Sequence, residues 1–181
     1  MAKKIAVLVG SLRKESFNRK IALELKRLAP EGLQLDIVEI GNLPLYNEDL
    51  EQNLPEEWRI FRETLQQSDG VLFISPEYNR TIPGTLKNAI DVGSRPPGKS
   101  SWKGKPGAVV SVTKSALGAF GANHNIRQAV VFLDVPMMLQ PEAYIGNVAK
   151  LFKEDGKTAV EDTEKFLQNF INEFEKWVNR F

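Results

Sequence analysis

The sequence predicts an α/β fold in which helices cover both faces of a five-stranded parallel sheet. Three short, mainly apolar runs are typical of strands buried on both faces. These runs are Ile5–Val9, Gly70–Ile74 and Gly107–Val112. Segments with helical spacing of apolar residues follow the strands, and this alternation favours a doubly wound parallel sheet.

The first strand leads into a polar loop and then into a helix. Ile5–Val9 is followed by Gly10–Asn18, and apolar residues then recur three and four apart from Ile21 to Ala29. A helix that starts after a strand offers free backbone N–H groups and a partial positive charge, and both favour an anion. We therefore expect a phosphate site at this loop.

This loop lacks two common phosphate motifs. Gly10 is its only glycine, so neither G-x-x-x-x-G-K-[ST] nor G-x-G-x-x-G is present. Side chains supply the hydrogen-bond donors instead, namely Ser11, Arg13, Ser16 and Asn18. The alternative interpretation is that Ser16 only caps the helix, while Arg13 and Lys14 are solvated.

The rest of the chain supplies four further strands and the helices between them. The predicted elements are, in order, a strand over Leu33–Ile40, a loop over Gly41–Leu54, a helix from about Pro55, the strand Gly70–Ile74, a helix from Pro83 to about Val92, a polar connection over Ser94–Pro106, the strand Gly107–Val112, a small-residue loop over Thr113–Ala122, a helix over about Asn123–Asp134, a strand over Pro136–Gln140, and a final helix over about Val160–Phe181. The apolar stripe of the last helix is typical of core packing. We expect a single domain over residues 1–181.

Two of these strands resemble edge strands. Leu33–Ile40 largely alternates, and the fifth strand ends at Pro141, which a central ladder would not tolerate. The order 2-1-3-4-5 places both outside and reverses between strands one and three. Ligands bind at such a switch point, beyond the carboxyl ends of the strands. The loops Gly10–Asn18, Pro76–Asn79 and Thr113–Gly121 should therefore border one crevice.

Composition excludes several classes of function. A formal net charge of +1 with no long basic run argues against a nucleic-acid partner and against a strongly acidic electron carrier. The absence of cysteine excludes a thiol nucleophile and iron–sulfur ligation, and a single histidine makes a histidine-based zinc site implausible, so no metal is expected. No apolar run approaches a membrane span and the amino terminus has no signal-peptide core, so we expect a cytoplasmic protein without a membrane partner.

No side chains form an evident catalytic constellation. His124 lies at a helix start with no nucleophile-elbow sequence. The carboxylates Glu48, Asp49 and Glu51 lie in a polar loop, where we expect them to be solvated. The lack of an evident catalytic constellation is consistent with an enzyme in which a bound cofactor performs the chemistry.

The three loops offer complementary groups for such a cofactor. Phosphate donors lie in the first loop, and the aromatic ring of Tyr78 lies in the second. Small residues in Ser115–Gly121 allow backbone N–H groups to approach a flat ligand closely. Together they describe a site for a phosphorylated planar heteroaromatic molecule, which flavin mononucleotide (FMN) fits.

Several segments are similar to a known family. They are Gly10–Arg13 with Ser16 and Asn18, and, more specifically, Pro76–Asn79 with Ile82–Gly84 and Leu86–Asp91. Over about Lys4 to Leu139 the chain resembles the NADPH-dependent FMN reductases, a flavodoxin-like group that includes quinone, azo and chromate reductases. The resemblance implies a three-layer sandwich, noncovalent FMN, and NAD(P)H as co-substrate.

The resemblance also implies roles for individual residues. Ser11, Arg13, Ser16 and Asn18 would hold the phosphate, Pro76, Glu77, Tyr78 and Asn79 would surround the flavin ring, and Ser115 and Gly118 would close its far side. No side chain would be catalytic. NAD(P)H would reduce the flavin and leave before a quinone, azo compound, metal oxyanion or second flavin binds, in a ping-pong cycle. Members of the family form homodimers or homotetramers.

Arg80 and Ala122 depart from the pattern of this family. Arg80 stands where such proteins often carry an aromatic residue, and Ala122 stands where a second glycine is frequent. The connection Arg95–Lys105 could supply cations to the 2′-phosphate of NADPH. Alternatively, it is a solvated lid with Trp102 packed beneath it.

Two other functions compete with a reductase. A flavodoxin-like FMN electron carrier would dock on protein partners, although near-neutral charge gives little electrostatic steering. A NAD(P)-dependent dehydrogenase would place Glu39 on a ribose, but the glycine fingerprint of that class is missing.

Overall fold

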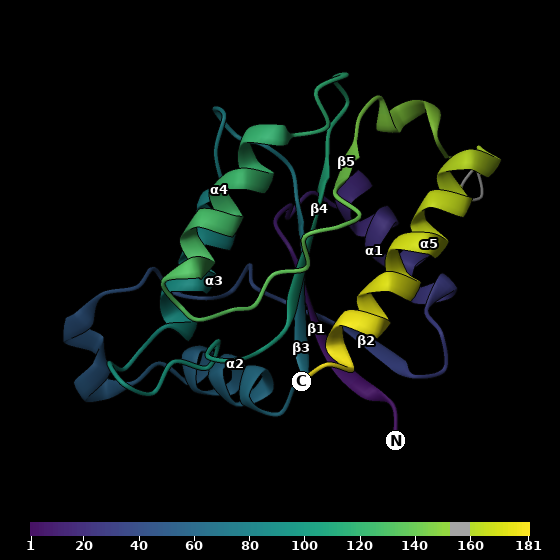
Figure 1. The fold of residues 1–181 in the computed structure, drawn as a ribbon. Helices are drawn as coiled ribbons and strands as arrows, with labels where there is room; N and C mark the ends of the chain where they lie inside the picture. The colour runs from purple at the N-terminus through teal and green to yellow at the C-terminus, as the bar shows by residue number, and fades with distance from the viewer. Residues whose placement is uncertain (153–159) are drawn as a thin grey trace.

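A computed structural model describes residues 1–152 and 160–181 and contains a five-stranded sheet (Figure 1). The strand order is β2-β1-β3-β4-β5, and every pair is parallel, which confirms the predicted fold class and order. The strands are β1 (Lys3–Val9), β2 (Leu33–Val38), β3 (Gly70–Ser75), β4 (Gly107–Val112) and β5 (Ala143–Ile145).

Burial of the strands follows the hydrophobic pattern of the sequence. The central strands β3 and β4 are buried along their whole length, as is β1 from Ile5 onward. β2 lies at an edge and alternates at its start, where Leu33 and Leu35 are buried and Gln34 is exposed. Continuous apolar runs therefore mark the interior of the sheet, and alternation marks its edge.

Helices cover both faces of the sheet and complete a three-layer sandwich. Figure 1 shows α1 and α5 on one face and α2, α3 and α4 on the other. The helices are α1 (Phe17–Leu28), α2 (Glu56–Gln66), α3 (Gly84–Gly93), α4 (Phe120–Val131) and α5 (Glu161–Val178), with short 3₁₀ helices η1 (Glu48–Asn53) and η2 (Val148–Lys150). No helix in residues 1–152 or 160–181 is long and apolar enough to span a membrane.

Each face of the sheet has its own hydrophobic core. On one face, Phe170 and Phe174 of α5 pack with α1. On the other, Trp58 of α2 and Trp102 of the connection before β4 are completely buried, and Trp102 Nε1 donates to Ile90 O over 2.9 Å. Burial of one large apolar side chain contributes about 1.5–3 kcal/mol. Trp102 is therefore packed beneath its connection, as one of the two interpretations proposed.

The predicted position of the fifth strand is wrong. The sequence predicts it over Pro136–Gln140, whereas β5 comprises Ala143–Ile145 and pairs with the end of β4. In the predicted segment, Met137 forms only an isolated bridge with Gly107. Prolines at both ends of this segment lack the N–H that a ladder requires, so regular pairing starts only after Pro141.

The prediction that the carboxylates after β2 are solvated is wrong for Glu51. Glu48 and Asp49 are exposed, but Glu51 lies on η1 and its Oε1 is 2.6 Å from Nη2 of Arg62. Arg62 is buried on α2 and also donates to Val92 O over 2.8 Å. A buried guanidinium requires a charged partner, so Glu51 is a structural residue.

Candidate functional site

The loops that follow β1, β3 and β4 border one pocket of about 220 Å³. It therefore lies at the carboxyl ends of the strands, where the strand order reverses, as predicted. Most of the predicted site residues line this pocket: Ser11, Arg13, Ser16, Asn18, Pro76, Glu77 and Tyr78. Asn79, Ser115 and Gly118 are outside its lining. We call this pocket the switch-point pocket.

The loop after β1 places its polar groups at the amino end of α1. Ser16 caps this helix, because its Oγ accepts a hydrogen bond from the backbone N–H of Arg19 over 3.3 Å. Ser16 and Ser11 are both buried, whereas Arg13 is exposed. Capping and pocket lining are thus compatible roles for Ser16; the predicted cap is confirmed, and phosphate binding by this loop stays a prediction.

Asn18 contributes a buried side-chain oxygen to this pocket. Its side chain is 6% exposed, and its Oδ1 is buried without a hydrogen-bond partner among the described residues. An unpaired buried acceptor costs about 1–3 kcal/mol, and most buried polar atoms in folded proteins have a partner. The serine hydroxyl groups and the dipole of α1 fit a phosphate ester, and Asn18 Oδ1 fits a hydroxyl donor on the same ligand.

The loop after β3 forms a tight turn that is fastened to α4. Tyr78 and Thr81 exchange two backbone hydrogen bonds, of 3.1 and 3.0 Å, around Asn79 and Arg80, which both have positive φ angles. Glu77 is the fastening residue, because its Oε2 accepts from the backbone N–H of Ala122 over 3.1 Å. Its carboxylate therefore positions the loop, while Tyr78 remains half exposed beside the pocket.

Gly121 makes this close contact between the loop and α4 possible. A Cβ atom at Gly121 would lie 2.6 Å from the carbonyl oxygen of Arg80 and 2.8 Å from Oε2 of Glu77. The neighbouring Ala122 is completely buried in the hydrophobic core region. Only one glycine is therefore required here, and Ala122 does not disturb the contact.

A buried polar network holds the loop after β4. Ser111 Oγ donates to the carbonyl oxygen of Gly118 over 2.6 Å, and Asn123 Nδ2 lies 3.2 Å from the same Oγ. Gly118 has a φ of 60°, and a Cβ atom there would be 2.7 Å from the Cβ of Tyr144. Gly118 thus packs against β5, and Ser115 is exposed at the surface.

The pocket includes residues that the sequence did not single out. Thr113 and Lys114 follow β4 directly, and their place at a strand end was a usable signal. Phe17 also lines the pocket, and the Nζ atoms of Lys20 and Lys114 lie 5.5 and 5.6 Å from the centre of its ring. Val148 comes from η2, far along the chain, and no local pattern marked it.

Positive charge predominates around the switch-point pocket. Arg13 and Lys114 line it, and neither has a carboxylate partner within ion-pair distance in residues 1–152 and 160–181. Glu77 is the carboxylate in the lining, and it lies 3.4 Å from Arg80 Nη1. Unpaired cations around a cleft raise the local concentration of an anionic ligand.

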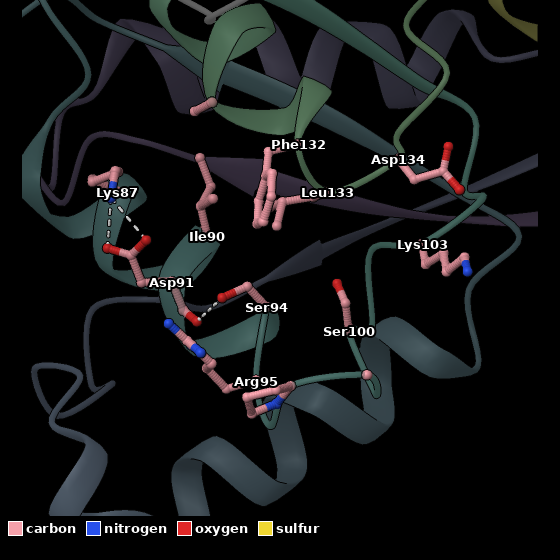
Figure 2. Close-up of a pocket in the computed structure, with 13 residues that line it drawn as sticks. Lys87, Ile90, Asp91, Ser94, Arg95, Ser100, Lys103, Phe132, Leu133 and Asp134 are labelled. Atoms are coloured by element: carbon pink, nitrogen blue, oxygen red, sulfur yellow. Dashed lines mark hydrogen bonds and ion pairs between the residues drawn. The ribbon is translucent and has the colours of Figure 1, made fainter.

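A larger cavity, of about 650 Å³, lies elsewhere, between α3, α4 and the connection that precedes β4 (Figure 2). Figure 2 shows Phe132 and Leu133 at the end of α4 opposite Ser94 and Arg95. None of the predicted site residues lines it. Arg95 and Lys103 line this cavity and do not line the switch-point pocket, and the contribution of their connection to NADPH binding stays a prediction.

His124 belongs to an aromatic cluster. Its Nε2 is 2.9 Å from the hydroxyl of Tyr144, and its ring centre is 4.2 Å from that of Phe120. Burial and a hydrogen bond with Glu142 raise the pKa of Tyr144 to about 12. In the described part of the chain, no group of three or more histidine, cysteine, aspartate or glutamate side chains could hold a metal ion.

Known proteins are similar to this chain over almost its whole length. A family model described as NADPH-dependent FMN reductase matches residues 3–150. A quinone reductase of Pseudomonas putida KT2440 is 60% identical over 175 residues, which cover 96% of this chain and 94% of the relative. A 2-hydroxy-1,4-benzoquinone reductase of a Burkholderia species is 45% identical, over 98% of this chain and 97% of the relative.

A solved structure has the same fold. The flavoenzyme FerB of Paracoccus denitrificans, an NAD(P)H:(acceptor) oxidoreductase, superposes with a TM-score of 0.94 and 42% sequence identity. The match covers 99% of this chain and 98% of that one. The match therefore extends over the whole sandwich.

Proposed function

Because the chain belongs to the NADPH-dependent FMN reductase family, we propose that it is an NAD(P)H-dependent quinone reductase that holds FMN noncovalently. Family membership confirms the resemblance drawn from the sequence. The observation that carries the proposal is the switch-point pocket, which has buried hydroxyl groups. Among the described residues, its cations Arg13 and Lys114 have no carboxylate partner and Asn18 Oδ1 has no hydrogen-bond partner. These groups match the phosphate and the hydroxylated side chain of FMN.

Each loop has a defined task in this proposal. Ser11, Arg13, Ser16 and Asn18 hold the phosphate, and Thr113 and Lys114 extend the polar wall on the β4 side. Pro76, Glu77, Tyr78 and Asn79 flank the ring, with Glu77 acting through its bond to α4, and Ser115 and Gly118 close the far side. The bound flavin supplies the hydride and electron chemistry, so these side chains bind and orient.

The size of the pocket is compatible with a partly uncovered flavin. Its volume of about 220 Å³ is below the range of about 300–1,000 Å³ that is usual for small-molecule sites, so it encloses only part of FMN. An uncovered ring face is then open to NAD(P)H and to the acceptor in turn, as in a ping-pong cycle. Quinones are the proposed acceptors, and azo compounds, metal oxyanions and free flavins are further candidates for the same face.

An anaerobic absorbance experiment tests this function. We expect purified protein to show oxidised flavin bands that bleach on addition of NADPH or NADH and return when a quinone is added. Bands that persist with both nucleotides would contradict a reductase and favour an FMN carrier that needs a partner reductase. Bound NAD in place of flavin would favour the dehydrogenase alternative.

We further propose a homodimer or homotetramer. The Phe132 side chain is 92% exposed and that of Val131 is 73% exposed, beside the 650 Å³ cavity with its apolar wall of Ile90 and Leu133. A protruding ring and a cavity on one face can make that face self-complementary, because in a two-fold interface each copy offers both to its partner. This arrangement supports self-association through the ends of α3 and α4.

Phe132→Ser tests that face by light scattering after gel filtration. We expect the variant to have a lower mass than the wild-type oligomer, whereas Ile60→Ser, at a half-exposed position on α2, keeps the wild-type mass. A wild-type monomer, or an unchanged mass for Phe132→Ser, would contradict the proposal.

We also propose that residues 1–181 act as one domain in the cytoplasm. Packing of the carboxyl-terminal α5 with α1 in one core supports a single domain. The absence of cysteine fits a reducing compartment. A single cooperative unfolding transition is the expected result for one domain.

A further inference from the structure

A separate cavity of about 360 Å³ lies at the carboxyl ends of β1 and β2. Its walls come from the loop after β1, from Arg19 on α1 and from Ile37–Ile40 at the end of β2. We call it the β2 cavity. Ser11 and Arg13 line both the β2 cavity and the switch-point pocket, so the two are neighbours that share a wall. The volume is sufficient for a small molecule.

Cations outnumber carboxylates in the lining of the β2 cavity. Arg13, Lys14 and Arg19 contribute positive charge, and Glu39 is the carboxylate. Arg19 Nη1 lies 2.8 Å from Glu39 Oε1, and the side chains are 44% and 65% exposed. In the described part of the chain, Lys14 has no carboxylate within ion-pair distance. The cavity therefore favours an anion.

Apolar side chains form the remainder of the cavity. Val9 and Ile40 are buried in its lining, and Leu12 is 57% exposed at its mouth. An apolar wall with a few charged groups at one side suits a flat ring that carries a phosphate. In dinucleotide-binding folds of a different strand order, a carboxylate binds the 2′-hydroxyl of NAD and an arginine accommodates the 2′-phosphate of NADP, so these two kinds of side chain can distinguish the two dinucleotides.

We propose that the β2 cavity binds the adenosine end of the reduced dinucleotide, and that Lys14 and Arg19 recognise its 2′-phosphate. This inference rests on the proposed function, because a dinucleotide must reach the flavin. The Arg19–Glu39 ion pair then sets the preference between the two dinucleotides. A 2′-phosphate competes with Glu39 for Arg19, whereas the 2′-hydroxyl of NADH donates to Glu39.

Calorimetric titration of the FMN-loaded protein with 2′,5′-ADP and with 5′-ADP tests the proposal without turnover. We expect wild-type protein to bind 2′,5′-ADP more tightly. Lys14→Gln and Arg19→Gln should each weaken binding of 2′,5′-ADP by about threefold to tenfold, as for a partly solvated charged contact, and should leave binding of 5′-ADP almost unchanged. Glu39→Gln should strengthen binding of 2′,5′-ADP, because Arg19 is released.

Lys26→Gln is the matched control. Lys26 lies in the last turn of α1, with its Nζ 3.8 Å from Asp36 Oδ1, and does not line the cavity. Its substitution by glutamine therefore removes the same charge as Lys14→Gln without changing the cavity lining. Equal weakening by Lys26→Gln and Lys14→Gln would show a general charge effect and would overturn the site. Wild-type binding of 2′,5′-ADP in both Lys14→Gln and Arg19→Gln would also overturn it.

The ratio of kcat/KM for NADPH to that for NADH gives a second readout. We expect this ratio to fall in Lys14→Gln and Arg19→Gln and to rise in Glu39→Gln. Flavin content and bleaching by NADH report the proposed function separately. Normal flavin with unchanged dinucleotide preference would therefore overturn only the β2 cavity assignment, while loss of flavin from the wild type would overturn the function.

Discussion

The loops after β1 and β4 contribute to the same site but are held in different ways. The loop after β1 has few internal side-chain bonds and leaves Asn18 Oδ1 without a described partner. The loop after β4 is held by a buried network in which Ser111 and Asn123 fix the carbonyl oxygen of Gly118. One loop keeps its polar groups available for a ligand, whereas the other uses them to maintain its own shape.

Asn123→Ala tests the network side of this comparison and has the largest expected effect. The change removes donors to Ser111 Oγ and Ala143 O and the acceptor for Arg127 Nε, all at a completely buried position. We expect the free energy of unfolding to fall by about 2–4 kcal/mol. Urea denaturation measures it, with the exposed Gln128→Ala as a control on the same helix. A smaller loss of unfolding free energy than in Gln128→Ala would contradict the structural role assigned to the network in the loop after β4.

Arg13→Ala tests the ligand side. The side chain is exposed and the described residues give it no ion pair, so its removal should hardly change the stability of the empty protein. We expect FMN affinity to fall by about 1–3 kcal/mol, the usual cost of a lost charged hydrogen bond. Fluorescence titration of apoprotein with FMN measures this change. Unchanged affinity would remove the phosphate role assigned to this loop.

The smallest expected effect concerns Tyr144 of β5, the strand against which Gly118 packs. The pKa of Tyr144 is raised to about 12 from 10.0, so its neutral form is favoured in the folded state. Its contribution to stability is complete below pH 10 and is lost as the pH rises from about 10 to 12. Denaturant titrations over this range should show a shallower loss in Tyr144→Phe than in wild type. Parallel curves would contradict the shift.

The helix cap and the position of the loop after β1 were predictable from the sequence because their determinants are local. A serine cap, neighbouring donors and a helix start lie within Gly10–Asn18, and the hydrophobic runs placed the strands around them. The loop after β4 depends on residues distant in the chain, since Gly118 contacts Tyr144 and the pocket wall includes Val148. Such contacts leave no local pattern. Because of these distant contacts, Ser115 and Gly118 lie outside the lining of the switch-point pocket.

The misplaced fifth strand and the ion pair of Glu51 have related causes. β5 is only three residues long, and a longer apolar segment with prolines at its ends precedes it. Strand length was therefore a misleading criterion, and the missing N–H groups decided the outcome. Glu51 became structural because η1 brings it to Arg62, and a short 3₁₀ helix has no strong hydrophobic periodicity to predict it from.

Asn18 Oδ1 has no hydrogen-bond partner among the described residues, so folding and cofactor binding make different demands on this position. For folding alone, an apolar residue of similar volume would suit a position that is 6% exposed, because it would leave no buried acceptor unpaired. Asn18→Leu should thus give an empty protein that is more stable but binds FMN less well. Selection for thermostability in the absence of the cofactor would therefore favour variants that lose it, a trade-off between stability and activity that begins at one side chain.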